Sequence, residues 1–271
     1  MSTPAGDKVF AGSVPRIYGE LMVPMVFAPY ARDLVARVEG RAISALLEIA
    51  AGTGAVTREL ADRLPAGVSI VATDLNQPML DQAARAGSSQ PVTWRQADAM
   101  QLPFADASFD TVVCQFGVMF FPDRVQAYAQ VRRVLRPGGG FVFNTWDRIE
   151  ANELAAAVQH ALDGLYPDDP PRFMARTPHG YFDPAVLRAD LARAGFRDAP
   201  VISQVRARSR GSSARSVAEA FCQGTPLRAE LESRGPGELL RATDAVTVAV
   251  ERRFGAGVIE GEMSALVVEV A

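Results

Sequence analysis

The stretch from Leu46 to Leu64 constrains the fold of this chain more than any other part of the sequence. An apolar run that contains one acid, Glu48, leads into the small residues Ala50-Ala51-Gly52-Thr53-Gly54, and a helical pattern follows. This order predicts a strand, a tight turn and a helix. Small residues in the turn permit positive φ angles and the close approach of a ligand, and the helix start offers unpaired N–H groups. The turn is typical of a nucleotide cradle, although similar turns also occur where no ligand binds.

Two acids follow at the ends of the next predicted strands. A buried strand over residues 69–74 ends in Asp74, twenty residues after Gly54, and a third strand over 92–99 ends at a second acid, Asp98. An acid at the end of the second strand can accept hydrogen bonds from both hydroxyls of a ribose that lies beside the first turn. Asp74 is therefore the second fixed point of the predicted site.

Strands alternate with helices along the first half of the chain. Further strands are predicted over residues 109–116 and 141–146, with helices over 76–86 and 123–135. This alternation predicts an α/β fold in which helices cover both faces of a mostly parallel sheet, with a ligand crevice at the carboxyl ends of the strands. Beyond residue 147 the pattern predicts helices over 152–166, 185–194 and 238–254 and strands over 202–206 and 264–270.

Composition excludes several classes of function. The 271 residues are 48% hydrophobic and 22% charged, which suits one α/β domain with an insertion, and the net charge of −3 argues against a chain that grips nucleic acid. Cys114 and Cys222 have neither metal-binding nor disulfide spacing, as in a reducing cytosol. We see no secretory signal and no run of eighteen apolar residues, so we expect a soluble, cytoplasmic protein without a membrane span.

Two histidines are present, and only one is a candidate for catalysis. His179 lies in a loop, Pro178-His179-Gly180-Tyr181, with Asp183 nearby, whereas His160 falls in a helical stretch and is interpreted as a surface or packing residue. A loop histidine beside an acid can act as a general base, or it can simply brace the loop. We therefore take His179 and Tyr181 as the candidate catalytic residues.

The region after residue 147 is where a substrate is expected. Several aromatic side chains there suit a flat or apolar acceptor, namely Trp146, Phe173, Tyr181, Phe182 and Phe221. A run of arginines at positions 206, 208, 210 and 215 either attracts an anionic acceptor or marks a solvated edge.

Taken together, the motifs resemble those of the class I S-adenosylmethionine-dependent methyltransferases, and most of all the small-molecule group that includes the ubiquinone and menaquinone biosynthesis methyltransferases. The resemblance spans about residues 44–146 and is carried by Glu48-Ile49-Ala50-Ala51-Gly52-Thr53-Gly54, Ala72-Thr73-Asp74-Leu75-Asn76, Gln96-Ala97-Asp98-Ala99, Leu102-Pro103-Phe104, Ser108-Phe109-Asp110 and Arg133-Val134-Leu135-Arg136-Pro137-Gly138-Gly139. One position departs from the family pattern, because Ala50 stands where the first glycine is usual. Alanine is the smallest replacement, so we expect the loop to keep its shape.

The resemblance implies a Rossmann-like class I methyltransferase fold: a seven-stranded sheet of order 3-2-1-4-5-7-6, with the last strand antiparallel and a helical lid insertion. It implies four regions: an N-terminal lid segment over residues 1–40, a cofactor-binding core over 41–147, a substrate lid with an intervening core helix and strand over 148–235, and a C-terminal helix and strand over 236–271 that complete the core.

The resemblance also implies a role for each matching residue. Glu48 would orient the loop and the ammonium end of the methionine, and the backbone of Ala50 and Gly52 would cradle the methionine moiety. Asp74 would accept the two ribose hydroxyls. The remaining cofactor contacts would come from Asp98 to the adenine amino group, the Ala99 N–H to a ring nitrogen, Leu75 and Met100 on the adenine faces, and Gln115 and Phe116 toward the methyl donor and substrate. Independently of the resemblance, the aromatic N-terminal segment either packs on the sheet or places Tyr18 and Tyr30 in a lid over the ligand.

The predicted activity is methyl transfer from S-adenosylmethionine to O, N or C of a small, partly apolar molecule, with S-adenosylhomocysteine as product and no metal. A nicotinamide-dependent oxidoreductase is the first alternative, but it needs the spacing G-x-G-x-x-G, and Thr57 stands in the place of the last glycine. A catalytically silent binding module is the second, and such a protein would be expected to lose the ribose acid or the loop. The sequence makes no prediction about oligomeric state.

Overall fold

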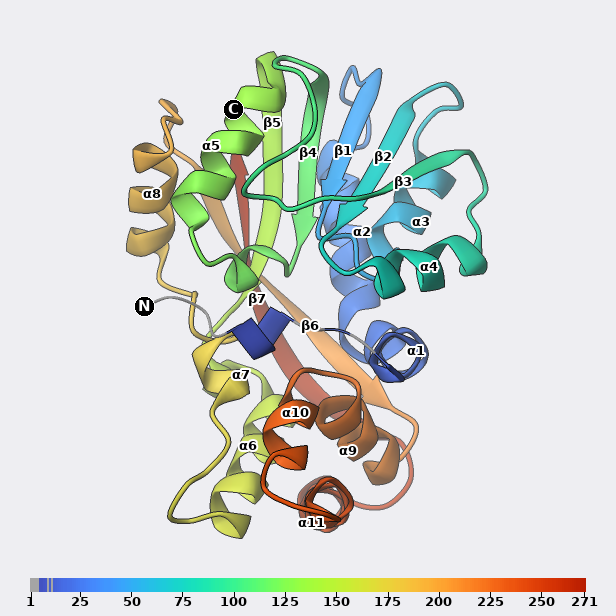
Figure 1. Cartoon of the computed structure of the whole chain (residues 1–271), viewed down its shortest axis with the longest axis vertical. Coiled ribbons are helices and arrows are strands. Elements are labelled where there is room, and N and C mark those ends of the chain that lie inside the picture. The colour runs from blue at the N-terminus through green and yellow to red at the C-terminus, as the bar shows by residue number, and fades with distance from the viewer. Residues whose placement is uncertain (1–4, 9, 11) are drawn as a thin grey trace.

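The computed structural model of the chain describes residues 5–8, 10 and 12–271, and its centre is a seven-stranded sheet (Figure 1). The strands are β1 (Ala45–Ile49), β2 (Ser69–Asp74), β3 (Val92–Gln96), β4 (Phe109–Gln115), β5 (Leu135–Trp146), β6 (Val201–Gly211) and β7 (Ile259–Val270). Their order is β3-β2-β1-β4-β5-β7-β6, and β7 runs antiparallel to both of its neighbours. The predicted fold class and strand order are confirmed.

Helices cover both faces of the sheet because side chains on each strand alternate in direction. On one face α2 (Ala28–Val38) and α3 (Ala55–Arg63) pack on Leu46, and on the other α5 (Arg124–Val134) and α8 (Pro184–Arg193) enclose the core that contains Leu47. The helix α4 (Gln77–Ala86) lies beside β2 and β3. Strands that are apolar on both faces are the signature of a buried parallel sheet.

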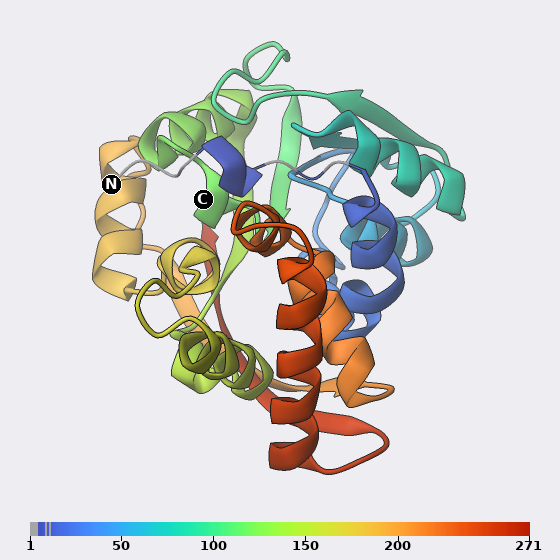
Figure 2. The same cartoon turned by 60° about the horizontal axis from the view of Figure 1, so that its bottom comes forward.

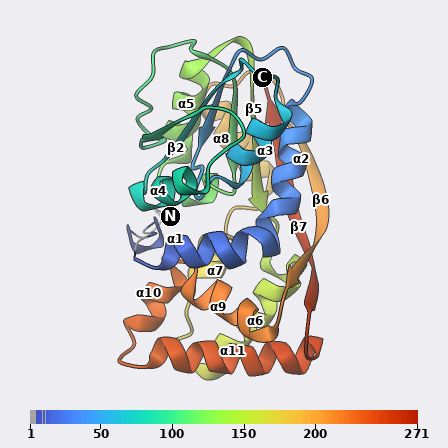
Figure 3. The same ribbon diagram turned by 90° about the vertical axis from the view of Figure 1, so that its right-hand side faces the viewer.

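The N-terminal segment is helical over a longer range than the sequence predicts. We expect a regular helix from residue 31, but α1 (Val14–Ile17), a π-helix (Tyr18–Phe27) and α2 follow one another without a break. Pro24 inside the π-helix has no N–H to donate, and the wider turn accommodates that loss. Figure 3 shows this segment crossing between the sheet and the helices below it. Residues 1–4, 9 and 11 of the predicted N-terminal lid lie outside the described residues.

A second group of helices forms a cap beyond the carboxyl edge of the sheet (Figures 1 and 2). It consists of α6 (Glu153–Leu165), α7 (Phe173–Arg176), α9 (Ala214–Gln223), α10 (Leu227–Glu232) and α11 (Glu238–Phe254). The cap stands on the part of the β6–β7 ladder that extends past β5, where Ala207 pairs with Met263 and Gly211 with Ile259. Three short 3-10 turns complete the described elements, at Ala5–Lys8, Val118–Phe120 and Ile149–Ala151.

The C-terminal helix lies in the cap and not in the core. We expect residues 236–271 to complete the core, and β7 does so, but α11 packs against α9 and α6 at the end of the molecule opposite β1 to β4 (Figure 3). The amphipathic pattern of a helix identifies its buried face but not the element that covers that face. This part of the prediction is therefore corrected.

The arginine run belongs to a solvated edge. Arg206, Arg208 and Arg210 alternate along β6, which is an edge strand, and all three are exposed. Arg208 and Arg210 lie within ion-pair distance of Glu260 on β7. Charged side chains on an edge strand discourage pairing with another sheet. Among the residues that the structure describes, no helix is both long and apolar enough to cross a membrane.

Candidate functional site

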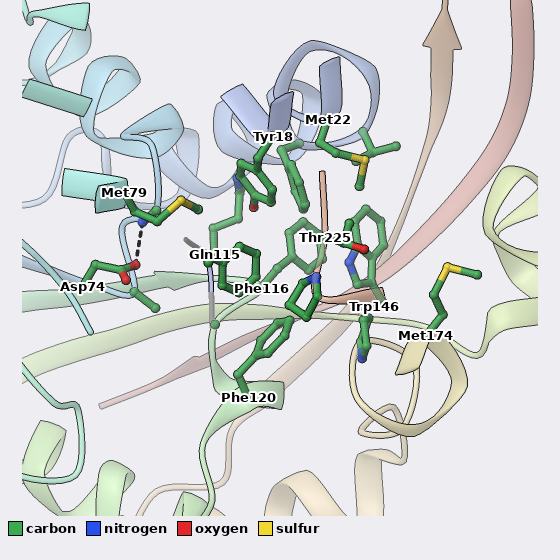
Figure 4. A pocket seen from close by; sticks show the side chains of 18 of the residues that line it. Tyr18, Met22, Asp74, Met79, Gln115, Phe116, Phe120, Trp146, Met174 and Thr225 are labelled. Atoms are coloured by element: carbon green, nitrogen blue, oxygen red, sulfur yellow. Dashed lines mark hydrogen bonds between the residues drawn. The ribbon is translucent and has the colours of Figure 1, made fainter. Parts of the chain in front are cut away.

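A cavity opens at the carboxyl ends of β1, β2, β4 and β5, between the sheet and the cap. Its empty volume is about 1440 Å³, including the part open to solvent. Figure 4 shows Asp74 on one side of the cavity and Met174, Trp146 and Thr225 on the opposite side. We call the side that contains Asp74 the strand-end half of the cavity. We call the opposite side the cap-side chamber, and it is lined by Trp146, Phe173, Met174, His179, Phe221 and Met263.

The turn after β1 keeps the predicted conformation. Ala50, Gly52 and Gly54 all have positive φ angles, 53°, 56° and 79°, and both Ala50 and Gly52 line the cavity. The left-handed region costs a non-glycine residue about 1–2 kcal/mol, so Ala50 carries strain that a glycine would not. Gly117 leaves room for the Ala50 methyl group because it has no side chain. A Cβ added to Gly117 would lie 2.4 Å from the Ala50 Cβ.

Asp74 ties the turn to the end of β2. Its Oδ2 accepts a hydrogen bond from the Gly52 N–H at 2.9 Å, and its Oδ1 accepts one from the Asn76 N–H at 2.8 Å. Burial raises the pKa of this carboxyl, and the hydrogen bonds from Asn76 and Gly52 oppose that effect. The Asn76 Nδ2 group makes a third, longer contact with Oδ1, at 3.4 Å. Because a carboxylate has about four acceptor positions, at least one, on Oδ2, is left for a ligand in the cavity.

The other predicted adenosine contacts share this end of the cavity. Leu75, Asp98, Ala99 and Met100 all line it. Asp98 Oδ1 accepts a hydrogen bond from the Met100 N–H at 2.9 Å, which fixes the loop after β3. The strand-end half therefore brings together two acids, the left-handed turn and two apolar side chains, as the sequence predicts.

Glu48 does not line the cavity. Its side chain is buried behind the turn, where Oε2 accepts a hydrogen bond from the Thr57 hydroxyl at 2.5 Å. Burial raises the pKa of Glu48 to about 8, against the opposing effects of the Thr57 hydrogen bond and the Arg58 charge. The structure gives Glu48 a part in joining the turn to α3, and its predicted contact with the methionine ammonium group stays a prediction.

Phe116 is held in a strained conformation at the end of β4. Its φ angle is +50°, which is rare for a bulky side chain. Two contacts hold it there: its N–H donates to Asn144 Oδ1 at 2.8 Å, and its ring stacks on Trp146 with centroids 3.9 Å apart. Strain of this kind, about 1–3 kcal/mol, tends to persist at ligand sites. The sequence analysis did not identify Asn144, because only the strand register places it beside Phe116.

Gln115 and Tyr18 also line the cavity. Gln115 Oε1 is buried without a partner among the described residues, and such an atom calls for an explanation. The Tyr18 ring stacks on Phe27 with centroids 5.0 Å apart. Burial and the nearby charge of Asp74 raise the pKa of Tyr18, so its hydroxyl stays protonated. Tyr30, by contrast, is wholly buried and belongs to the core.

The two candidate catalytic residues are separated by the structure. His179 lines the cavity, and its Nδ1 lies 2.8 Å from the Asp147 carbonyl oxygen. A carbonyl only accepts, so Nδ1 carries the proton and the neutral ring presents Nε2 as an acceptor. Burial lowers the pKa of His179 to about 4, so the ring is neutral at pH 7. Asp183, predicted as a possible partner, instead accepts from the Ala185 N–H at the start of α8.

Tyr181 lies behind the cavity wall. Its hydroxyl donates to Asp190 at 2.9 Å, and the Arg124 guanidinium lies 4.2 Å from its ring centroid. The side chain is buried and does not line the cavity. Side chains that are close together in a loop can point in different directions, and the sequence pattern does not reveal those directions. Tyr181 therefore braces the loop, and only His179 is carried forward as a candidate catalytic residue.

Replacing Gly180 by alanine is expected to lower the free energy of unfolding by about 1–3 kcal/mol, as in an overpacked core. An added Cβ would lie 2.1 Å from the carbonyl oxygen of Arg176, a backbone atom that cannot move without unwinding α7. Urea denaturation measures the loss. The matched control is Gly164→Ala in α6, where an added Cβ meets no atom within 4 Å and stability should hold or rise. Equal stability of the two variants would contradict this account.

The charged side chains of the cavity are all acidic. Asp74, Asp98 and Glu262 line it, and the lining residues described by the structure include no lysine or arginine. Within the described ranges, no group of three or more His, Cys, Asp or Glu side chains is placed to hold a metal ion.

Comparison with known proteins agrees with this geometry. Residues 47–143 match the family model of the methyltransferase domain. The matched segment runs from the middle of β1 through β4 and most of β5, and it includes Gly52, Asp74 and Asp98. The family resemblance drawn from the motifs is confirmed.

Two curated relatives are similar to the matched segment and its surroundings. A demethylmenaquinone methyltransferase from Deinococcus radiodurans is 36% identical over 152 residues, covering 51% of this chain and 63% of the relative. A malonyl-[acyl-carrier protein] O-methyltransferase from Geobacter sulfurreducens is 35% identical over 167 residues, covering 61% of this chain and 60% of the relative. The chain thus spans less than two thirds of the length of either relative.

Solved structures share the fold. A phosphoethanolamine N-methyltransferase 2 from Haemonchus contortus, in complex with phosphomonomethylethanolamine and S-adenosylhomocysteine, has a TM-score of 0.57 at 14% identity. The match covers 95% of this chain and 56% of that one. At this level of identity the likeness concerns the arrangement of the elements alone.

Proposed function

We propose that this chain transfers a methyl group from S-adenosylmethionine to a small, partly apolar molecule and releases S-adenosylhomocysteine. The observation that carries the proposal is the convergence of Asp74, Asp98 and the left-handed turn at one end of a cavity whose other end is apolar. The methyltransferase domain match, and the methyltransferase names of the relatives, support the same activity. We also propose a cytoplasmic location, because both cysteines are free thiols.

The strand-end half fits the proposed cofactor. Gly52 gives a turn without side-chain bulk, and the carboxylate oxygens of Asp74 suit ribose hydroxyls. Asp98 suits the adenine amino group, with Leu75 and Met100 against the ring faces. The unpartnered Gln115 Oε1 suits the electropositive methionine end. We propose that the segment over residues 14–38 closes the cavity, through Tyr18, and that the cap supplies the acceptor site.

Methyl transfer itself requires little chemistry from the protein side chains. When bound, S-adenosylmethionine supplies a methyl group already activated by the sulfonium charge; the carbon–sulfur bond breaks, and its electron pair stays on sulfur. The cavity must align the acceptor atom with that methyl group and exclude water. A hydroxyl or amine acceptor also loses a proton, and we assign to His179 Nε2 the role of accepting it, as a weak base because burial lowers the pKa of the ring.

Charge in the cavity separates this proposal from the nicotinamide alternative. A dinucleotide carries an anionic pyrophosphate, and the charged residues that line the cavity are acids. The described lining offers no lysine or arginine to pair with that group, whereas a sulfonium cation needs none. The all-acidic lining therefore supports methyl transfer.

Calorimetric titration of the full chain with S-adenosylmethionine, S-adenosylhomocysteine and NAD tests the proposal. We expect binding of the first two ligands at micromolar concentrations and no measurable binding of NAD. Tight binding of NAD without either sulfur ligand would overturn the assignment. A silent binding module would bind S-adenosylmethionine but would give no methylated product with any member of an acceptor panel.

A further inference from the structure

The cap-side chamber contains few polar side chains, and most of them are already paired within the protein. The Thr225 hydroxyl donates to the Phe221 carbonyl at 2.7 Å and accepts from the Leu227 N–H at 3.2 Å. Ser209 donates to the Gly261 carbonyl at 2.9 Å. These hydroxyls therefore have little to offer a ligand.

Asn152 is paired as well. Its Nδ2 donates to the Arg148 carbonyl at 3.1 Å, and its Oδ1 accepts from the Ser264 N–H at 3.1 Å. Glu262 also borders the cavity, but its side chain is exposed. The paired polar groups serve to hold the chamber wall and the base of the cap together.

Two polar atoms of the chamber remain without a protein partner. In the part of the chain that the structure describes, no hydrogen bond engages the indole N–H of Trp146 or Nε2 of His179, and neither atom is among the fully buried ones. The two ring centroids are 6.0 Å apart. One is a donor, and the other is an acceptor because the Asp147 carbonyl fixes the proton on Nδ1.

We infer that the chamber selects an uncharged, flat apolar molecule that carries a hydroxyl group between His179 and Trp146. A hydroxyl both donates, to Nε2, and accepts, from the indole N–H, so one small group satisfies both atoms. A carboxylate would satisfy the indole N–H but would face the Nε2 lone pair, and the chamber has no described cation to compensate its charge. This inference rests on the proposed function, which assigns the strand-end half to the cofactor.

The rest of the chamber fits such a molecule. Phe173, Met174, Phe221 and Met263 are all buried and apolar, and they line the same cavity as the two polar atoms. An apolar surround strengthens a hydrogen bond to the correct ligand and penalises a ligand that leaves a polar atom unpaired. His179 and Trp146 are therefore the residues that determine specificity.

Three probes of similar shape test the inference: 2-naphthol, 2-methylnaphthalene and 2-naphthoate. Each is titrated into the complex of the full chain with S-adenosylhomocysteine. We expect 2-naphthol to bind about tenfold more tightly than 2-methylnaphthalene and 2-naphthoate to bind most weakly. Equal or tighter binding of 2-naphthoate, or no binding of 2-naphthol at millimolar concentration, would overturn the inference. Failure of S-adenosylhomocysteine itself to bind would instead count against the proposed function.

The variant His179→Asn separates recognition from structure. The Asn Nδ2 can still donate to the Asp147 carbonyl and brace the loop, but nothing replaces the Nε2 acceptor. We expect the preference for 2-naphthol over 2-methylnaphthalene to fall to within about twofold, with unchanged affinity for S-adenosylhomocysteine. His179→Gln, which can place an amide oxygen near the Nε2 position, should restore part of the preference. The control is His160→Asn on the exposed side of α6, and a preference that survives His179→Asn unchanged would refute the role of His179.

Discussion

Replacing Asp74 by asparagine is expected to weaken the binding of S-adenosylhomocysteine by roughly 30-fold or more, about 2 kcal/mol. The carboxylate accepts from two backbone N–H groups, those of Gly52 and Asn76, and offers its other acceptor positions to the ligand. An asparagine has one acceptor oxygen, so one of those N–H groups loses its partner, and the charge that strengthens each hydrogen bond disappears. Calorimetric titration of both proteins measures the effect.

Two comparisons make this result specific to the ribose. Asp81→Asn removes an exposed carboxylate from α4 and should leave the affinity unchanged. Adenosine and 2′,3′-dideoxyadenosine then separate a ribose contact from a disturbed turn. If Asp74 holds the ribose hydroxyls, the wild type prefers adenosine and the Asp74→Asn variant loses that preference. An affinity within threefold of the wild type, or a preference that survives, would refute the assignment.

The strand-end half of the site was predictable because its residues are local to the chain. A strand, a turn of small residues and the acid at the next strand end form a short-range pattern, and parallel strands bring their carboxyl ends to one edge. Asp74 and Asp98 therefore reach the same cavity as Gly52 without any knowledge of long-range contacts. The expected left-handed turn survives even with alanine at position 50.

The cap-side chamber was not predictable in the same way. Its walls come from segments far apart in the chain, such as Met174 after α6 and Met263 in β7, and only tertiary packing places them together. The sequence singled out both His179 and Tyr181, but the direction of each side chain depends on the tight turn at Gly180. The same limit explains α11, whose apolar face was evident while its partners in the cap were not.

The sequence motif and the structure suggest different roles for Glu48. Its buried position predicts that the free energy of unfolding depends on pH. Its pKa is about 8 in the folded protein against an ordinary value of 4.5, with burial as the main cause. The folded state therefore holds this proton more tightly than the unfolded chain does. The stabilisation is fully present below pH 4.5 and is lost as the pH rises through 8. Each tenfold difference in proton affinity corresponds to about 1.4 kcal/mol.

The variant Glu48→Gln should remove this dependence. Its amide oxygen can still accept from the Thr57 hydroxyl, and it carries no charge at any pH. Between pH 5 and pH 9 we expect the free energy of unfolding of the wild type to fall by about 2–4 kcal/mol more than that of the variant. Urea denaturation at a series of pH values measures the difference, and Glu59→Gln on the partly exposed side of α3 is the control. Parallel pH profiles for wild type and Glu48→Gln would show that the buried carboxyl is ionised throughout, as a direct partner for a methionine ammonium group would need to be.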